Sequence, residues 1–301
     1  MFHVKHSRRN SGKPAGELKT MLNYPLILVH GAGFRDRTMG INYWGRIPRY
    51  LAGEGVTFHY SGTDAWGNIE SNGELIKRTI LAVLQKTKAE KVNILAHSRG
   101  GLEARYAISA LGMENVVASL TTISTPHRGA KTMNIALKFP KLMYRFVSVI
   151  VNTISSLMGD VNPDFFESSR QLSELYCTQF NRDYPDKNVI YYQSYASVLR
   201  FFFGDVLYLL TWVLVRIFDG PNDGLCPVES AIWGDFRGTV TSRRLLGVSH
   251  GGILDLYRLP FRGVRLIPPS AKKLPEHIYP AFFKIPELYL AIIRELSEKG
   301  F

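Results

Sequence analysis

The sequence predicts an α/β fold with a mostly parallel central sheet and helices on both faces. Short apolar runs alternate along the chain with segments whose apolar residues recur at helical spacing. The apolar runs are nearly continuous, as strands are when helices cover both faces of a sheet. The chain has 301 residues, 46% of them hydrophobic and 21% charged, which suffices for a large core and excludes a disordered chain.

The first half of the chain shows this alternation most clearly. Strands are predicted within 24–34, where a glycine-rich turn follows the apolar run, and within 56–62, 91–98 and 116–125. Helices are predicted over 72–87 and 100–111. In the first of these, apolar residues at helical spacing are Leu75, Ile76, Ile80, Val83 and Leu84. Strands that alternate with helices imply a parallel sheet.

After residue 130, two strongly apolar segments interrupt the pattern. Segments 131–160 and 200–218 are too apolar for solvated loops, so a helical lid or cap is predicted over about 131–185 and 200–218. Burial of both segments in the core is the alternative. A membrane span over 201–218 is disfavoured, because spanning needs roughly 20 apolar residues and Asp205 and Arg216 interrupt the run.

The remaining elements resume the alternation. A helix is predicted around 170–185, a strand in 188–197, a strand followed by a loop in 238–252, and a closing amphipathic helix over 285–296.

The N-terminal segment differs in composition from the rest of the chain. Residues 1–20 are predicted to form a mobile basic tail before a single domain over 21–301. The tail's charges are Lys5, Arg8, Arg9, Lys13 and Lys19 against Glu17. No apolar stretch follows these cations, so the sequence as written contains no secretory signal and predicts a cytoplasmic protein. Export by another route, or with a leader absent from this sequence, is the alternative.

Charge and cysteine content restrict the partners. The net charge of +12 favours anionic partners in general, whether lipid, fatty acid or nucleic acid. No basic helix interleaved with aromatics and no nucleic-acid motif is present, so no nucleic-acid partner is expected. Cys177 and Cys226 are too few for a disulfide framework or a metal cluster. They are expected to be free thiols, and a disulfide between them is the alternative.

The pentapeptide Ala-His-Ser-Arg-Gly at 96–100 lies between a predicted strand and a predicted helix. In that context, A/G-x-S-x-G indicates a sharp turn on which the serine adopts a strained backbone and its hydroxyl stands clear of the sheet. Small residues at both ends, Ala96 and Gly100, let strand and helix approach closely. Ser98 is therefore the candidate nucleophile.

A serine hydroxyl needs a base to become a nucleophile. Among eight histidines, His250 follows the last predicted strand in the glycine-flanked loop Gly-Val-Ser-His-Gly-Gly, and it is the candidate base. His97 adjoins Ser98 in sequence, so its side chain should point away from the hydroxyl.

The third group should be a carboxylate between Ser98 and His250 in the chain order Ser…Asp…His. Asp223 in Asn-Asp-Gly is the candidate, and Asp219 is its rival, because Asp-Gly pairs form turns by default. The developing oxyanion needs two backbone donors. These are expected to be the N–H of Arg99 and the N–H of Ala32, in the narrow loop His30-Gly31-Ala32-Gly33.

Six sequence blocks together resemble the bacterial triacylglycerol lipases of the Pseudomonas, Burkholderia and staphylococcal types. They are YPLILVHGAGF, KVNILAHSRGGLEARY, TTISTPHRGA, FNRDYPDKNVIYYQSYAS, NDGLCPVES and SHGGILD, in this order over roughly 24–260. The resemblance implies an α/β-hydrolase fold, a helical lid and carboxylester hydrolysis. Carried over motif by motif, it implies a triad of Ser98, Asp223 and His250, with Ala32 and Arg99 as oxyanion donors.

One departure from that family concerns a metal site. The lipases often have an aspartate two residues after the histidine that helps to hold a structural calcium. Here Gly252 stands there and Asp255 is the nearest aspartate, so Asp255 is the candidate calcium ligand and no other cofactor is implied.

The resulting functional hypothesis is a lipase that cleaves medium- or long-chain acylglycerols through an acyl-enzyme. Its partners would be the lipid or ester substrate and a lipid–water interface. A short-chain esterase, thioesterase or polyester hydrolase is one alternative, and a non-catalytic lipid- or partner-binding relative is another. The oligomeric state stays open. Candidate substrate contacts are Gly31, Phe34, His97, Val147, Ile150 and Trp212.

Overall fold

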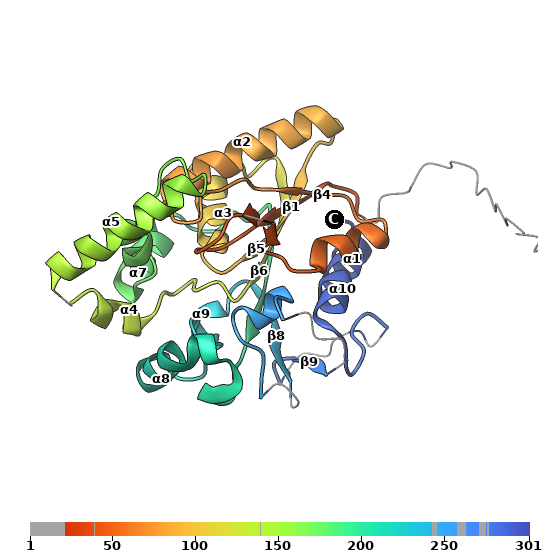
Figure 1. Cartoon of the computed structure of the whole chain (residues 1–301). Helices are drawn as coiled ribbons and strands as arrows, with labels where there is room; N and C mark the ends of the chain where they lie inside the picture. Colours follow the sequence, from red (N-terminus) through yellow and green to blue (C-terminus); the bar gives the residue numbers. More distant parts are fainter. Residues whose placement is uncertain are drawn as a thin grey trace, which may run out of the picture.

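The computed structural model describes residues 22–38, 40–138, 140–242, 246–257, 263–270, 275 and 277–301. The predicted tail over 1–20 lies outside the described residues. Seven strands of the described chain form one sheet in the order β4-β1-β5-β6-β7-β8-β9 (Figure 1). All neighbours are parallel except β8 and β9. The predicted α/β fold with a mostly parallel sheet is confirmed.

The strands of the sheet lie close to their predicted positions, with the exception of β9. They are β1 (Leu26–Val29), β4 (Phe58–Tyr60), β5 (Val92–His97), β6 (Val117–Ile123), β7 (Tyr191–Ser197), β8 (Asp235–Ser242) and β9 (Val264–Ile267). A separate two-stranded pair, β2 (Arg37–Thr38) and β3 (Ile41–Asn42), follows β1. Neither β9 nor this pair was predicted, because these strands are short and carry no long apolar run.

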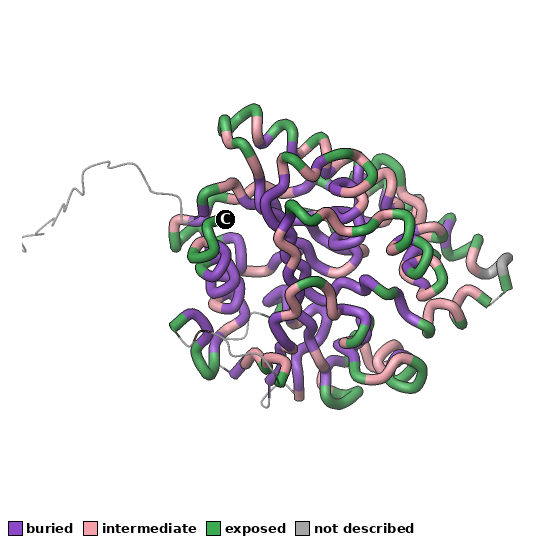
Figure 2. Tube along the Cα trace, turned by 180° about the vertical axis from the view of Figure 1, so that it is seen from behind, coloured by how far each residue is buried: buried purple, intermediate pink, exposed green. Residues whose placement is uncertain are grey.

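Helices cover both faces of the sheet. On one face lie α2 (Ile69–Thr87) and α3 (Gly100–Ser109), and on the other α1 (Ile47–Gly53) and α10 (Ile285–Glu298) (Figure 1). Alternating strand residues supply the two cores: Leu95 packs in the layer of α10, whereas Ile94 and Ala96 pack in the layer of α2 and α3. The buried residues are accordingly concentrated along the centre of the molecule (Figure 2).

The two apolar segments form helices that are shorter than the segments themselves. Between β6 and β7 lie α4 (Lys131–Ala136), α5 (Lys141–Leu157), α6 (Phe165–Arg170) and α7 (Glu174–Asp183). Pro140 precedes α5, so 131–160 is two helices rather than one. Between β7 and β8, Phe202–Gly204 (η1) and Val206–Tyr208 (η2) are 3-10 turns, and only α8 (Leu209–Phe218) is α-helical.

Residues 131–185 and 200–218 are here called the cap. Helix α4 packs against α7 and α8, so the two parts of the cap are in contact. In Figure 1 the cap lies to one side of the sheet, in green and teal. Two short elements, α9 (Val228–Ala231) and η3 (Gly252–Leu254), complete the described chain. Among the described helices, none combines the length and apolar character that crossing a membrane requires.

Candidate active site

Ser98 stands at a sharp turn between β5 and α3. Its backbone φ is +55°, a left-handed conformation that few non-glycine residues adopt. Gly100 permits the turn, since a Cβ there would lie 2.3 Å from the carbonyl oxygen of His30 and 2.9 Å from that of Val29. The strained serine and the close approach of strand and helix both correspond to the sequence-based prediction.

Three side chains from distant parts of the chain meet at this turn. His250 Nε2 lies 2.9 Å from Ser98 Oγ, and His250 Nδ1 lies 2.9 Å from Asp223 Oδ2. Ser98 follows β5, Asp223 follows α8, and His250 follows β8. The backbone N–H of His250 also donates to the carbonyl of Asp223 at 2.8 Å, which holds the two loops together.

The Asp223 carboxylate is fully buried and has several donors. Oδ2 accepts from the Ser197 hydroxyl at 2.8 Å, and Oδ1 accepts from the N–H groups of Cys226 at 2.8 Å and Leu225 at 3.1 Å. Burial by itself would raise the pKa of Asp223, but His250 and these donors outweigh it, so its pKa lies below the usual range. The carboxylate is therefore kept charged and pointed at the imidazole.

The rival carboxylate, Asp219, has a different position. It accepts from the backbone N–H groups of Lys131 at 2.7 Å and Thr132 at 3.0 Å, at the start of α4. Asp219 thus joins the two parts of the cap, and the structure brings Asp223 rather than Asp219 to His250.

The loop after β1 lies directly against Ser98. A Cβ on Gly31 would fall 2.6 Å from Ser98 Cβ, so only glycine fits there. The Gly31 N–H donates to the Tyr43 hydroxyl at 3.0 Å and the Gly33 N–H to the carbonyl of Ala65 at 3.2 Å. Between them, the N–H of Ala32 has no partner among the described residues, and neither has the N–H of Arg99. Both are available for a ligand beside Ser98.

Ser98 and His250 open into an apolar cavity of about 440 Å³. Ala32 and Phe34 line it from the loop after β1. The remaining lining comes largely from the cap and from loops that the sequence analysis did not single out. The larger side chains of this set are Tyr43, Trp66, Met133, Tyr144, Phe165, Leu172, Tyr208, Leu225, Leu254 and Leu256.

Five of the six predicted substrate contacts, all but Phe34, do not line this cavity. Gly31 lies directly against Ser98 instead. His97 is fully buried, with Nδ1 2.7 Å from the Tyr43 hydroxyl. Val147 and Ile150 are exposed on the outer side of α5, which lines the cavity through Tyr144 instead. Trp212 donates its indole N–H to the carbonyl of Leu199 at 2.9 Å. Helical spacing identified the apolar residues of the cap but not which of them face inward.

Asp255 does not fit the role of a calcium ligand. Its Oδ2 accepts from Arg46 Nε at 2.6 Å and its Oδ1 from Arg46 Nη2 at 2.7 Å, so a guanidinium already neutralises both oxygens. Within the described part of the chain, no three His, Cys, Asp or Glu side chains are grouped as a metal ion would need. Cys177 and Cys226 are free and buried, in agreement with the prediction.

Comparison with known proteins points in one direction. Residues 54–161, which include Ser98, match the family model described as "Putative serine esterase (DUF676)". Triacylglycerol lipase 2 of Saccharomyces cerevisiae is 30% identical over 210 residues, covering 66% of this chain and 60% of the yeast protein. The triacylglycerol lipase of Burkholderia plantarii is 30% identical over 183 residues, covering 57% of this chain and 51% of its own length. The chain thus spans little more than half the length of these relatives.

Solved structures show the same fold at low sequence identity. A metagenomic carboxyl esterase superimposes with a TM-score of 0.67 at 15% identity, covering 99% of this chain and 82% of its own. The Staphylococcus hyicus lipase superimposes with a TM-score of 0.64 at 15% identity, covering 93% and 96% respectively. In sequence this chain is similar to the triacylglycerol lipases, and its fold is that of the α/β-hydrolases.

Proposed function

We propose that this protein is a serine carboxylester hydrolase of the triacylglycerol lipase type, which cleaves medium- or long-chain acylglycerols. The observation that carries the proposal is the hydrogen-bonded series Ser98–His250–Asp223, with both distances 2.9 Å, at an apolar cavity of about 440 Å³. The similarity to triacylglycerol lipases over 210 residues supports the substrate class.

The geometry suits a two-step acyl transfer. Asp223 accepts a hydrogen bond from the Nδ1–H group of His250, which leaves the Nε2 lone pair facing the Ser98 hydroxyl. The hydroxyl oxygen attacks the ester carbonyl carbon while its proton passes to Nε2. The N–H groups of Ala32 and Arg99 receive the oxyanion. The imidazolium then protonates the leaving alcohol, and a water activated in the same way releases the fatty acid from Ser98.

The central test is covalent labelling with a fluorophosphonate probe followed by peptide mapping. We expect one adduct on Ser98 in the wild-type protein and none in Ser98→Ala. A wild-type protein that folds and remains unlabelled at Ser98 would refute the assignment as a serine hydrolase and leave the non-catalytic alternative.

We further propose that the cap is a lid that meets a lipid–water interface. Cap residues Met133, Tyr144, Phe165 and Tyr208 line the cavity, so the cap covers the site. Its outer surface is apolar: Phe146 is 68% exposed, Leu157 84% and Leu207 79%. The cap also presents exposed cations, which would favour an interface rich in carboxylate product. Among the described residues they are Lys131, Lys138, Arg145, Arg170, Arg182, Arg200 and Arg216.

A chain-length series separates a lipase from a short-chain esterase. Rates should be measured on p-nitrophenyl esters from acetate to palmitate, and on triglycerides below and above their solubility limit. The proposal predicts activity on octanoate and longer esters and a rise in rate when an emulsion forms. A maximum at acetate or butyrate with no gain on emulsions would favour the short-chain esterase.

A further inference from the structure

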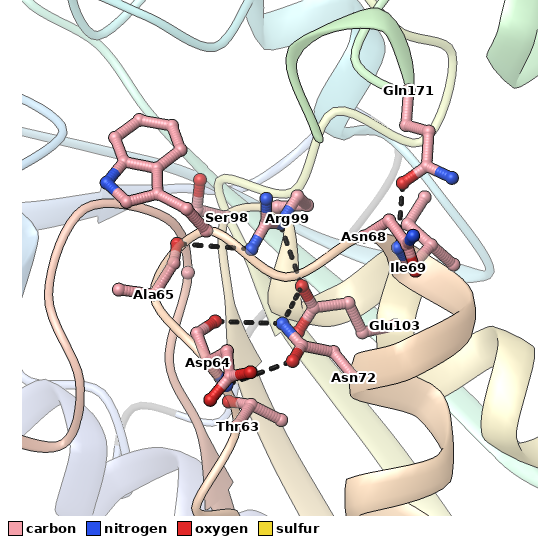
Figure 3. A network of polar contacts seen from close by, with 12 residues as sticks. Thr63, Asp64, Ala65, Asn68, Ile69, Asn72, Ser98, Arg99, Glu103 and Gln171 are labelled. Atoms are coloured by element: carbon pink, nitrogen blue, oxygen red, sulfur yellow. Dashed lines mark hydrogen bonds and ion pairs between the residues drawn. The ribbon is translucent and has the colours of Figure 1, made fainter. Parts of the chain in front are cut away.

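The buried guanidinium beside the nucleophile is the feature that the triad does not explain. The Arg99 side chain is completely buried, although it follows Ser98 directly. Its Nε donates to Glu103 Oε1 at 2.7 Å, one turn along α3, and its Nη2 donates to the carbonyl of Ala65 at 3.2 Å. Figure 3 shows this side chain running from the Ser98 turn to the loop at Ala65.

Residues 63–66, between β4 and α2, are hydrogen-bonded to the loop that contains Ala32. The ring of His30 is hydrogen-bonded to the Thr63 carbonyl at 3.0 Å, and the Gly33 N–H donates to the Ala65 carbonyl at 3.2 Å. The carbonyl oxygen of Ala65 therefore accepts from both sides of the site, from Gly33 and from Arg99. One oxygen atom connects the two segments that offer an N–H to the oxyanion.

Residues 63–66 are themselves held firmly from the outer side. Asp160, just after α5, accepts from the N–H groups of Ala65 and Trp66 at 2.9 Å each. In return, Asp64 Oδ2 accepts from the N–H groups of Val161 at 3.0 Å and Asn162 at 2.7 Å. The Arg99 guanidinium thus bonds to a fixed segment.

Glu103 is fastened to the same segment. Asn72 donates from one amide nitrogen to Glu103 Oε1 at 2.8 Å and to the carbonyl of Asp64 at 2.9 Å, and its Oδ1 accepts from the Asp64 N–H (Figure 3). The partner of Arg99 on α3 is therefore tied to residues 63–66 as well.

Stability alone does not account for this arrangement. Arg99 Nη1 and Glu103 Oε2 are buried and have no partner among the residues that the structure describes. Burying an ion pair with unsatisfied atoms is costly, and apolar side chains of similar size are often at least as stable in such places. A role in geometry explains why a cation stands there.

We propose that the Arg99 side chain is a positioning group for the oxyanion site. Its backbone supplies one N–H, and its guanidinium, through the Ala65 carbonyl, holds the loop that supplies the other at Ala32. The distance between the two donors is then set by one residue. This inference rests on the proposed esterase function for its catalytic consequence, but its structural part does not.

Two variants test the proposal. Arg99→Lys keeps the charge opposite Glu103 but offers a single nitrogen in place of the two separate nitrogens, Nε and Nη2, that bond to Glu103 and Ala65. Arg99→Met/Glu103→Met removes both charges together, so that neither is left buried alone. For both we expect kcat on a soluble short ester to fall about 10- to 100-fold with KM changed less than about twofold, because misplaced donors weaken transition-state binding.

Two further readouts separate positioning from a merely structural role. A trifluoromethyl ketone forms an adduct whose oxyanion lies between the two donors. Its inhibition constant should rise in proportion to the loss in kcat/KM. Hydrogen exchange in the peptide that contains Gly33 should become faster.

Arg105→Lys is the matched control. Arg105 is equally buried on the same helix, but its Nε pairs with Asp186 at 3.1 Å, away from residues 63–66. This variant should leave kcat, the inhibition constant and Gly33 exchange unchanged.

The outcomes are distinguishable. If Gly33 exchange stays slow in both Arg99 variants, or if kcat and the inhibition constant are unchanged in folded variants, the inference is wrong. Equal losses in Arg105→Lys would also overturn it. Absence of ester hydrolysis and of Ser98 labelling in the wild-type protein refutes the proposed function instead, and Gly33 exchange then still reports on the positioning of the loop.

Discussion

At the scale of single residues, the site depends on which carboxylate reaches His250. Asp223 and Asp219 are four positions apart, and each is followed by glycine. Asp223 is buried and accepts hydrogen bonds from Ser197 and Cys226, whereas Asp219 accepts from the first N–H groups of α4. The difference follows from burial and not from local sequence.

Asp223→Asn and Asp219→Asn form a matched pair. An amide at 223 would favour the wrong tautomer of His250, so we expect kcat on p-nitrophenyl butyrate to fall by roughly 10⁴-fold. Asp219→Asn should retain kcat within about threefold. Steady-state kinetics at neutral pH provides the measurement. A larger loss at 219 than at 223 would reverse the assignment of the acid.

At the scale of elements, the joint between β5 and α3 determines how Ser98 is presented. Gly100 has no room for a side chain, because the backbone carbonyls of Val29 and His30, at the end of β1, would lie within 3 Å of a Cβ there. Gly53 in α1 meets nothing within 4 Å. Two glycines, both in helices, therefore have opposite requirements.

Gly100→Ala should lower the free energy of unfolding by about 1–3 kcal/mol, because rigid backbone has to move. Gly53→Ala should leave it unchanged or raise it by about 0.5–1 kcal/mol, since alanine favours the helix. Urea denaturation of both variants gives the comparison. Equal stability of the two would contradict the close packing at the elbow.

The outer face of α8 allows a second comparison at this scale. Leu214 on α8 and Leu81 on α2 are each 48% exposed. We expect Leu214→Glu to reduce the rate on a triglyceride emulsion several-fold while the rate on a soluble butyrate ester is kept, because a charge there opposes contact with lipid. Leu81→Glu should change neither rate. Equal behaviour of the two variants on emulsions would count against the cap as the interfacial surface.

At the scale of the whole molecule, two histidines are buried in the neutral form. Burial, reinforced by the charge of His250, holds the pKa of His97 well below the usual value, and burial with Arg105 nearby does the same for His127. His97 contacts Tyr43, and His127 stacks on Trp233 at 5.1 Å between ring centroids. Protonation of either ring is therefore coupled to unfolding.

The protein should lose stability already at mildly acidic pH. Below about pH 6.5 the unfolded chain binds protons at these histidines and the folded chain does not. The free energy of unfolding therefore decreases as the pH is lowered, by up to about 1.4 kcal/mol per pH unit for each histidine. Urea denaturation between pH 5 and 8 measures the slope. His127→Gln should flatten it, and the exposed His277→Gln should not. An unchanged slope in His127→Gln would argue against a neutral buried ring.

Much of the fold was predictable from local pattern. Apolar runs identify β1, β5 and β6, and helical spacing identifies α2 and α10 within a few residues. Apolar character predicted a helical cap but not where its helices begin and end. Pro140 divides 131–160, and Gly204 and Asp205 keep the start of 200–218 out of α8.

The sequence by itself determined the alternation of strands and helices, the serine turn, and the local motifs that contain Ser98, His250 and the two candidate carboxylates, because each of these depends on residues close together in the chain. Only the tertiary structure decided which carboxylate meets His250, which cap side chains line the cavity, and that Arg99 reaches Ala65. Those contacts join segments tens to more than a hundred residues apart. They are set by the packing of whole elements, which local periodicity does not encode.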